Sequence, residues 1–208
     1  DVRHYLIISG IDGCGKTTLI QQLRDRLERE GLTTRYQWLR YNHRLVRPFH
    51  GLSRLIGLSR QYRVEGRYIW RHEFHRSPGF ATLYIALTWL DAWLGRLLLA
   101  ATLALRNVDV VVCDRWVADI VVDLAVDTRR RNLLGGPWQT RFTRILPPGA
   151  RQYLVVRDPD RVAVSRPDVR VDLSRSFRQR LYRRLERHPD VVVVRNDGTV
   201  DAAVEGVH

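Results

Sequence analysis

Apolar and β-branched residues gather in short runs along the chain, and longer stretches with helical spacing separate these runs. Five runs predict buried β-strands: residues 4–9, 33–39, 108–113, 152–156 and 191–194. The stretches with helical character are residues 16–30, 80–106, 118–126, 174–187 and 200–207. Strands that alternate with helices are typical of a parallel sheet with right-handed crossovers. We therefore expect an α/β fold with a five-stranded parallel sheet flanked by helices.

The segments between these elements carry many arginines and chain breakers. Residues 40–79 are rich in arginine, histidine and aromatic side chains and contain Pro48, Gly51 and Pro78, so we expect irregular structure there. Residues 129–149 and 158–174 are predicted to be a basic loop and a charged loop. No repeat or linker divides the chain, which predicts one domain over residues 1–208 with an insertion at about 40–79.

The most apolar stretch, residues 80–105, is long enough to cross a bilayer. Asp91 and Arg96 lie near its middle, where charges are costly in a membrane, so we expect a helix packed against the sheet and no transmembrane segment. Residues 2–9 lead straight into a glycine loop and show no secretory pattern. Two cysteines, Cys14 and Cys113, are too few for a disulfide framework. These features predict a cytoplasmic protein.

The chain is strongly basic. Its 208 residues carry a net charge of +13, and all the basic residues except Lys16 are arginines. Such an excess suits nucleic acid, an acidic membrane surface or a phosphorylated substrate, and it is equally compatible with a solvated arginine-rich surface. No nucleic-acid-binding module is recognisable. We expect at most weak, non-specific and salt-sensitive association with nucleic acid.

A glycine-rich loop joins the first predicted strand to the first predicted helix. Residues 10–17 read Gly-Ile-Asp-Gly-Cys-Gly-Lys-Thr and match the P-loop (Walker A) pattern G-x-x-x-x-G-K-[ST]. Glycines let backbone N–H groups turn toward an oxyanion, and the helix directs its positive end at the same point. We expect Lys16 to reach the β- and γ-phosphates of ATP and Thr17 to coordinate Mg²⁺. The candidate ATP-binding residues are Gly10, Gly13, Cys14, Gly15, Lys16, Thr17 and Thr18.

A second candidate site follows the strand at residues 108–113. Asp114 and Arg115 stand at its carboxyl end, where open α/β sheets bind their ligands. Asp114 is a candidate for holding a Mg²⁺-bound water, and Arg115 for facing the transferred phosphate. An aspartate in this position could instead cap the following helix.

Two motifs in this order, Gly10-Ile-Asp-Gly-Cys-Gly-Lys-Thr-Thr18 and Val-Cys-Asp114-Arg115-Trp116, resemble the thymidylate kinase family. The likeness continues through an Asp-Pro turn at Asp158, an arginine-bearing lid at about 158–174, a basic helix and a final strand–loop–helix. It implies a P-loop nucleoside monophosphate kinase fold with a short lid, ATP and Mg²⁺, and phosphoryl transfer to a 5′-monophosphate (dTMP to dTDP). It also implies a homodimer, for which the apolar helix could supply a face.

The same resemblance assigns roles by position. Asp12 resembles the P-loop acid beside the acceptor's sugar and phosphate, and Asp114 and Arg115 resemble the paired Asp-Arg at the reaction centre. Because the third variable loop position is a glycine, related enzymes supply the catalytic arginine from the lid, which makes Arg166 and Arg170 candidates. Residues 195–199 resemble the loop on the adenine side.

The acceptor side departs from the family pattern. Counting back from Asp114, the base-stacking aromatic and the following arginine fall near Trp89 and Trp93, which could stack on a base or belong to the core. The phosphate-binding arginine after the second strand has three candidates: Arg40, Arg44 and Arg47. Two alternatives therefore stay open. One is a kinase of another phosphorylated or hydroxyl acceptor, non-nucleotide or a nucleic-acid end; the other is a catalytically silent nucleotide-binding regulator.

Overall fold

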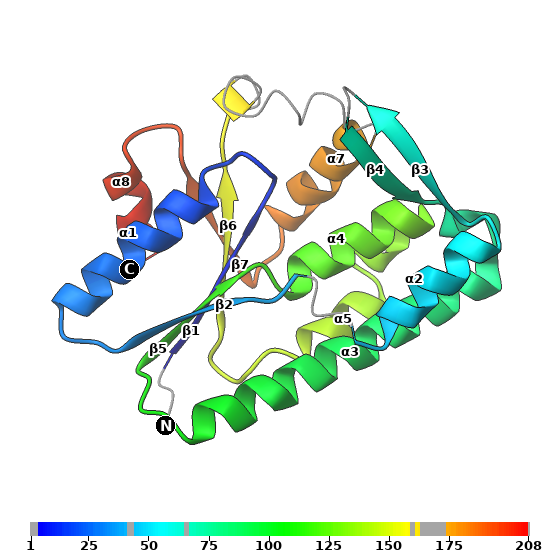
Figure 1. Ribbon diagram of the computed structural model, residues 1–208. Helices are drawn as coiled ribbons and strands as arrows, with labels where there is room; N and C mark the ends of the chain where they lie inside the picture. The colour runs from blue at the N-terminus through cyan, green and yellow to red at the C-terminus, as the bar shows by residue number, and fades with distance from the viewer. Residues whose placement is uncertain (1–3, 41–43, 65–66, 159–160, 163–173, 208) are drawn as a thin grey trace.

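Five parallel strands form the central sheet of the computed structural model, which describes residues 4–40, 44–64, 67–158, 161–162 and 174–207. Their order across the sheet is β2-β5-β1-β6-β7, and Figure 1 shows them in the middle of the molecule. The bounds are β1 His4–Gly10, β2 Thr34–Trp38, β5 Val110–Asp114, β6 Arg151–Val156 and β7 Val191–Arg195. The predicted five-stranded parallel sheet is confirmed, with ends that differ by one or two residues.

Helices cover both faces of this sheet (Figure 1). One face packs on α1 (Lys16–Arg29) and α8 (Val200–Glu205), whose buried side chains share a cluster with Leu6 and Ile8. The opposite face packs on a second group of helices: α3 (Pro78–Ala104), α4 (Val117–Thr128), α5 (Pro137–Thr143) and α7 (Arg175–Leu185). Because successive strand residues point to opposite faces, Ile7 belongs to this second cluster.

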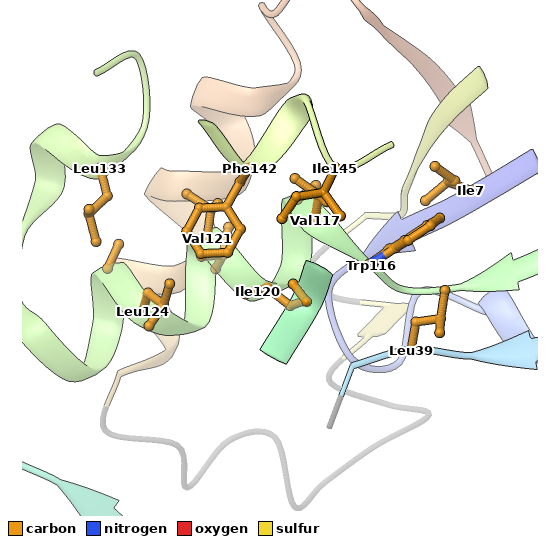
Figure 2. Close-up of a cluster of buried hydrophobic side chains, with 14 of the residues drawn as sticks. Ile7, Leu39, Trp116, Val117, Ile120, Val121, Leu124, Leu133, Phe142 and Ile145 are labelled. Carbon is orange, nitrogen blue, oxygen red and sulfur yellow. The ribbon is translucent and has the colours of Figure 1, made fainter. Parts of the chain in front are cut away.

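The second cluster anchors the carboxyl ends of β1 and β5. Figure 2 shows Trp116 between Ile7 and Leu39, and α4 presenting Val117 and Val121 toward the α5 region. Trp116 is almost fully buried and follows Asp114 and Arg115 directly. Tight packing at this point restricts the backbone that carries the candidate site.

The described residues between 40 and 79 are not irregular, contrary to the sequence-based prediction. They form α2 (Val46–Leu55), a hairpin of β3 (Ser59–Val64) and β4 (Arg67–His72), and a short 3₁₀ turn, η1 (Phe74–Arg76). Pro48 lies in the first turn of α2, where the missing N–H removes no helical hydrogen bond. Stacked rings of His50, His72 and Phe74 join α2 to the hairpin, a long-range contact that composition does not reveal.

Residues 129–149 are also more ordered than predicted. They contain the 3₁₀ turn η2 (Arg131–Leu133) and α5, which starts at Pro137. Proline at a first helical position is favourable, because its fixed φ suits the helix and no donor is needed there. The prediction of a basic loop over residues 129–149 is therefore wrong for this helix.

Asp91 is a buried carboxylate in the middle of the apolar helix α3. Its oxygens accept the backbone N–H groups of Arg44 at 3.1 Å, Leu45 at 2.8 Å and Val46 at 2.8 Å. These donors lie at the N-terminus of α2, whose N-cap residue Leu45 provides no side-chain cap. Asp91 therefore caps a neighbouring helix through the tertiary structure, which explains an acid in so apolar a segment.

Replacing this cap should weaken the fold. Asp91→Asn keeps one carbonyl acceptor and loses the negative charge at the helix N-terminus, so we expect it to lower the free energy of unfolding by about 1–3 kcal/mol. Urea denaturation measures the change. Asp201→Asn, at an exposed acid in the first turn of α8, is the matched control and should change little. Equal unfolding curves for the Asp91 variant and the wild type would show that the cap contributes nothing.

Helix α3 is, among the described residues, the one helix that is long and apolar enough to cross a membrane. Core helices of globular proteins meet the same criterion, so this is weak evidence for a membrane segment. Tyr84, Ile85, Leu99 and Leu103 on one side of α3 are buried in the cluster shared with α4. This packing agrees with the sequence-based expectation of a helix laid against the sheet layers.

Candidate phosphate-binding and phosphoryl-transfer site

The backbone of the glycine loop needs its glycines. Gly10, Gly13 and Gly15 have φ angles of 145°, 87° and 89°, which residues with a side chain rarely adopt. A Cβ on Gly10 would overlap the carbonyl oxygen of Val155 on β6, and one on Gly15 would overlap the Asn196 side chain. The loop thus lies directly against neighbouring elements.

Asn196 supports the loop from the end of β7. Its Nδ2 donates to the carbonyl oxygen of Cys14 at 2.8 Å, and its own backbone N–H donates to Val156 at 2.9 Å. It lies in residues 195–199, which resemble the adenine-side loop of the thymidylate kinase family. In this structure Asn196 is a positioning residue for the glycine loop, because it ties the loop to the sheet.

Lys16 is buried within the loop, with 6% of its surface exposed. Its ammonium donates to the carbonyl oxygens of Gly10 at 2.8 Å and Ile11 at 2.7 Å. Thr17 and Thr18 follow it as exposed residues in the first turn of α1, where backbone N–H groups have no intrahelical partner. An ammonium and a helix N-terminus at one place form a site suited to phosphate groups.

Asp114 ends β5 on the sheet face that α1 covers. The hydroxyl of Tyr36 donates to its Oδ2 at 2.9 Å, whereas its buried Oδ1 has no hydrogen-bond partner in the part of the chain that the structure describes. An unsatisfied buried carboxylate oxygen is an oxygen ligand of the kind that Mg²⁺ or a Mg²⁺-bound water requires. Asp114 therefore fits the metal site expected for Mg²⁺, and Thr17 stays a predicted ligand.

Two further observations define the role of Asp114. One oxygen of Asp114 accepts the Tyr36 hydroxyl and the other has no hydrogen-bond partner among the described residues, so Asp114 does not cap α4. Burial and then the neighbouring Asp114 raise the pKa of Tyr36 to about 12, so its phenol stays protonated and donates at neutral pH.

Arg115 follows Asp114 with a φ of 61°, in the left-handed region, and its side chain contacts α4 on the opposite face of the sheet. Its guanidinium donates to Gly10 at 3.2 Å, to Asp119 of α4 at 2.8 Å and to Asp12 in the glycine loop. Burial would lower the pKa of Arg115, but Asp119 and Asp12 more than offset this, so the pKa is raised and the group stays charged. Asp119 is fully buried and also accepts the Tyr182 hydroxyl at 2.6 Å.

Arg40 is the candidate that the structure brings to this centre from the end of β2. It forms a bidentate ion pair with Asp123 of α4, at 2.8 Å and 3.0 Å, and its Nη1 lies 3.6 Å from Asp12. Arg178 of α7 also pairs with Asp123. Burial would raise the pKa of Asp12, but Arg115 and then Arg40 hold it below its ordinary value, so Asp12 is a carboxylate at neutral pH.

The remaining acceptor-side candidates lie elsewhere. Arg44 and Arg47 are exposed at the start of α2. Trp89 and Trp93 contact each other edge-on, and the Trp89 indole donates to the Arg141 carbonyl of α5 at 3.2 Å. A narrow cavity beside Arg40 is lined instead by another face of α3, with Thr88, Asp91, Ala92 and Gly95, and by Leu39, Trp116 and Ile120.

Trp89 and Trp93 therefore do not line this cavity, and their placement in an acceptor pocket stays a prediction. The positions were counted along the chain, and at 3.6 residues per turn an error of one residue rotates a side chain by about 100° around the helix. Arg166 and Arg170 lie outside the described residues. The sequence reasoning also missed Asp119, Asp123 and Arg178. The signal available was three acids at intervals of four residues in the otherwise mainly apolar helix α4.

Asp127 lies one helical turn beyond Asp123, and its protonation makes the stability of the folded state depend on pH. Burial and then Asp123 raise the pKa of Asp127 to about 7, and the Tyr84 hydroxyl donates to it at 3.2 Å. In the unfolded chain its pKa is about 3.9. The folded state therefore keeps a proton that the unfolded state has released, and this stabilising term is lost as the pH rises from about 4 to about 7.

Asp127→Asn should remove this dependence. The amide still accepts from Tyr84 and cannot ionise, so we expect the stability of the variant relative to the wild type to rise by about 2 kcal/mol between about pH 5 and about pH 8. Urea denaturation at a series of pH values measures it. Asp201→Asn, at an exposed acid of α8, should leave the pH profile unchanged. Parallel profiles for wild type and Asp127→Asn would contradict the assignment.

The parallel sheet, the glycine loop and the acid at the end of β5 together define a P-loop kinase fold. No family model and no curated protein sequence matches the chain. Among solved structures, the chain is similar to a thymidylate kinase from Candida albicans, with a TM-score of 0.58 and 11% sequence identity over 98% of this chain and 88% of that one. At this sequence identity the similarity establishes the fold alone. The resemblance that the motifs indicated is therefore confirmed for the fold.

Proposed function

We propose that the chain is an ATP- and Mg²⁺-dependent phosphotransferase that passes the γ-phosphate to a nucleoside monophosphate, as a thymidylate kinase does. One observation carries the proposal: Lys16 of the glycine loop and Arg115 from the end of β5 both donate to the carbonyl oxygen of Gly10. Two cations from separate elements thus meet at the point where the loop would enclose the terminal phosphates. Charge stabilisation at that point is the main catalytic requirement of phosphoryl transfer.

The chain's own groups account for the chemistry. Lys16 and the loop N–H groups bind the β- and γ-phosphates, Arg115 faces the phosphate in transfer, and Asp12 lies between Arg115 and the acceptor. Bound Mg²⁺, held by Thr17 and Asp114, would neutralise the charge on the phosphate oxygens. A phosphorylated acceptor is already ionised, so positioning suffices and no strong base is needed. Arg166 and Arg170 remain the candidates for a lid that closes over the site and excludes water.

A second candidate acceptor is a hydroxyl compound without a phosphate. The observation that favours it is that Arg40, Arg115 and Arg178 are each already paired with a carboxylate. An acceptor phosphate would have to compete with buried aspartates for these guanidinium groups. The side chain of Asp12 is 44% exposed and could accept a hydroxyl proton instead. A silent regulatory protein is the third candidate.

Turnover with a panel of acceptors separates the three. ADP release with Mg²⁺ and ATP is measured alone and with nucleoside monophosphates, nucleosides, phosphorylated sugars and 5′-hydroxyl oligonucleotides. We expect at least one nucleoside monophosphate to raise the rate well above that of ATP alone. Stimulation only by unphosphorylated acceptors would replace the leading proposal by the second. Mg²⁺-dependent ATP binding without turnover of any acceptor would favour the regulator.

We further infer that the protein is a cytoplasmic homodimer that associates through α3. Leu83, Leu90 and Leu97 are exposed on this helix at intervals of seven residues, which aligns them along one stripe. Such an apolar stripe is suited to a second copy of the same surface. Light scattering of wild type and Leu90→Glu tests this, with Leu105→Glu beyond the helix as the control. A wild-type monomer at all concentrations would disprove it.

A further inference from the structure

Tyr36 stands next to the candidate metal ligand because of the register between β2 and β5. Trp38 pairs with Asp114 and Tyr36 with Val112 across these parallel strands. Residues two apart on a strand share a face, so Tyr36, Trp38 and Asp114 all lie on the face that α1 covers. Tyr36 is a diagonal neighbour of Asp114 on that face, a separation that a long aromatic side chain can span. Its hydroxyl reaches Oδ2 of Asp114 at 2.9 Å.

This hydrogen bond makes the two carboxylate oxygens of Asp114 unequal. Oδ2 is engaged by the phenol, and Oδ1 is buried without a hydrogen-bond partner among the described residues. A carboxylate held at one oxygen cannot rotate freely about its χ2 angle, so the other oxygen keeps one direction. Asp114 itself is 8% exposed, which leaves little room for water to take over this orienting role.

We propose that Tyr36 is a positioning residue of the metal site, whose phenol fixes the Asp114 carboxylate so that Oδ1 is presented to Mg²⁺ or its bound water beside Thr17. The proposal rests on the proposed function, because it presupposes that Asp114 serves a metal. Partners that orient a metal-binding carboxylate commonly change metal affinity by 10- to 100-fold when removed. Tyr36 lies on the edge strand β2, and no recognisable motif surrounds it, so the sequence alone did not identify it.

The test compares metal-linked nucleotide binding in matched variants. Binding of a non-hydrolysable ATP analogue is measured by calorimetry at increasing Mg²⁺ for wild type, Tyr36→Phe, Asp114→Asn and Tyr5→Phe. Tyr5→Phe also removes a phenol from the sheet, but from β1 and on the opposite face. We expect Tyr36→Phe to bind the metal-free analogue as the wild type does and to need about tenfold more Mg²⁺ for its half-maximal effect. Its turnover should approach that of the wild type at saturating Mg²⁺.

The outcomes are separable. If Asp114→Asn shifts the Mg²⁺ dependence and Tyr36→Phe follows the wild-type curve, the positioning role is overturned and the proposed function stands. If Tyr36→Phe weakens metal-free binding as much as metal-linked binding, the phenol is a structural support of the loop, and the inference fails as well. If the wild type binds the analogue without any Mg²⁺ dependence, the proposed function fails first. A Mg²⁺ shift in both Asp114→Asn and Tyr36→Phe, with Tyr5→Phe unchanged, supports the inference.

Discussion

Replacing Lys16 with alanine is expected to lower kcat/KM for ATP by about 10³-fold. The ammonium is buried in the glycine loop and donates to Gly10 and Ile11, so no other cation can occupy its place without moving the loop. It is also the one lysine of a chain in which every other basic residue is an arginine. This contrast suggests that the site needs a compact point charge and not a planar fork.

Steady-state kinetics with the acceptor found in the panel measures this effect. Lys16→Arg is the informative companion, because it keeps the charge and changes only its shape. The Cys14 sulfur lies 3.6 Å from the ammonium, so a guanidinium has little space, and we expect this variant to lose most of the activity too. Circular dichroism should show both variants folded. If Lys16→Ala kept activity within about tenfold of the wild type, the loop would not be the catalytic phosphate site.

Replacing Arg115 with methionine is expected to remove activity and to destabilise the fold by about 3–5 kcal/mol. The guanidinium neutralises Asp119, which has no exposed surface, and joins it to Asp12 in the glycine loop. Without it, Asp119 is a buried carboxylate whose remaining hydrogen bond in the described residues comes from the Tyr182 hydroxyl. The cost is thus mainly that of an unpaired buried charge.

A double variant separates the structural part of this effect from the catalytic part. Arg115→Met with Asp119→Asn removes both charges and keeps an acceptor for Tyr182, so it should regain much of the stability in urea denaturation. Activity should stay lost, because no cation then faces the phosphate in transfer. Full recovery of activity in the double variant would show that Arg115 serves the fold only. A stable single variant would show that Asp119 is readily protonated or solvated.

The glycine loop and the Asp114–Arg115 pair could be predicted from the sequence because their chemistry depends on local spacing. A strand, a P-loop and a helix are contiguous in the chain, and the loop conformation needs glycines at fixed positions, such as Gly10 and Gly15. The central strands β1, β5 and β6 were predictable for a similar reason, since a strand buried on both faces is apolar along most of its length. Confirmation of the likeness to thymidylate kinase extends to the fold, and the identity of the acceptor stays a proposal.

The acceptor side was predicted less well because its groups are brought together by packing. Arg40 was one of three arginines that the sequence could not rank, and it is distinguished by an ion pair with Asp123, 83 positions away. Trp89 and Trp93 were proposed by counting along the chain, whereas the rotation of α3 decides which of its side chains face the cavity beside Arg40. The stacked rings that hold α2 to the hairpin likewise join residues that no local pattern connects.

Eight consecutive residues, 10–17, specify the loop backbone, the start of a helix and a lysine, so the sequence alone predicts a polyphosphate-binding site there. Which polar side chains pair around this loop depends on tertiary contacts: Arg115 with Asp119, Arg40 with Asp123, and Tyr36 with Asp114. The physical reason is the sequence separation over which each interaction acts. Glycine conformation and helix initiation act between neighbours in the chain, whereas ion pairs and hydrogen bonds between strands and helices depend on register and rotation, which the whole core sets.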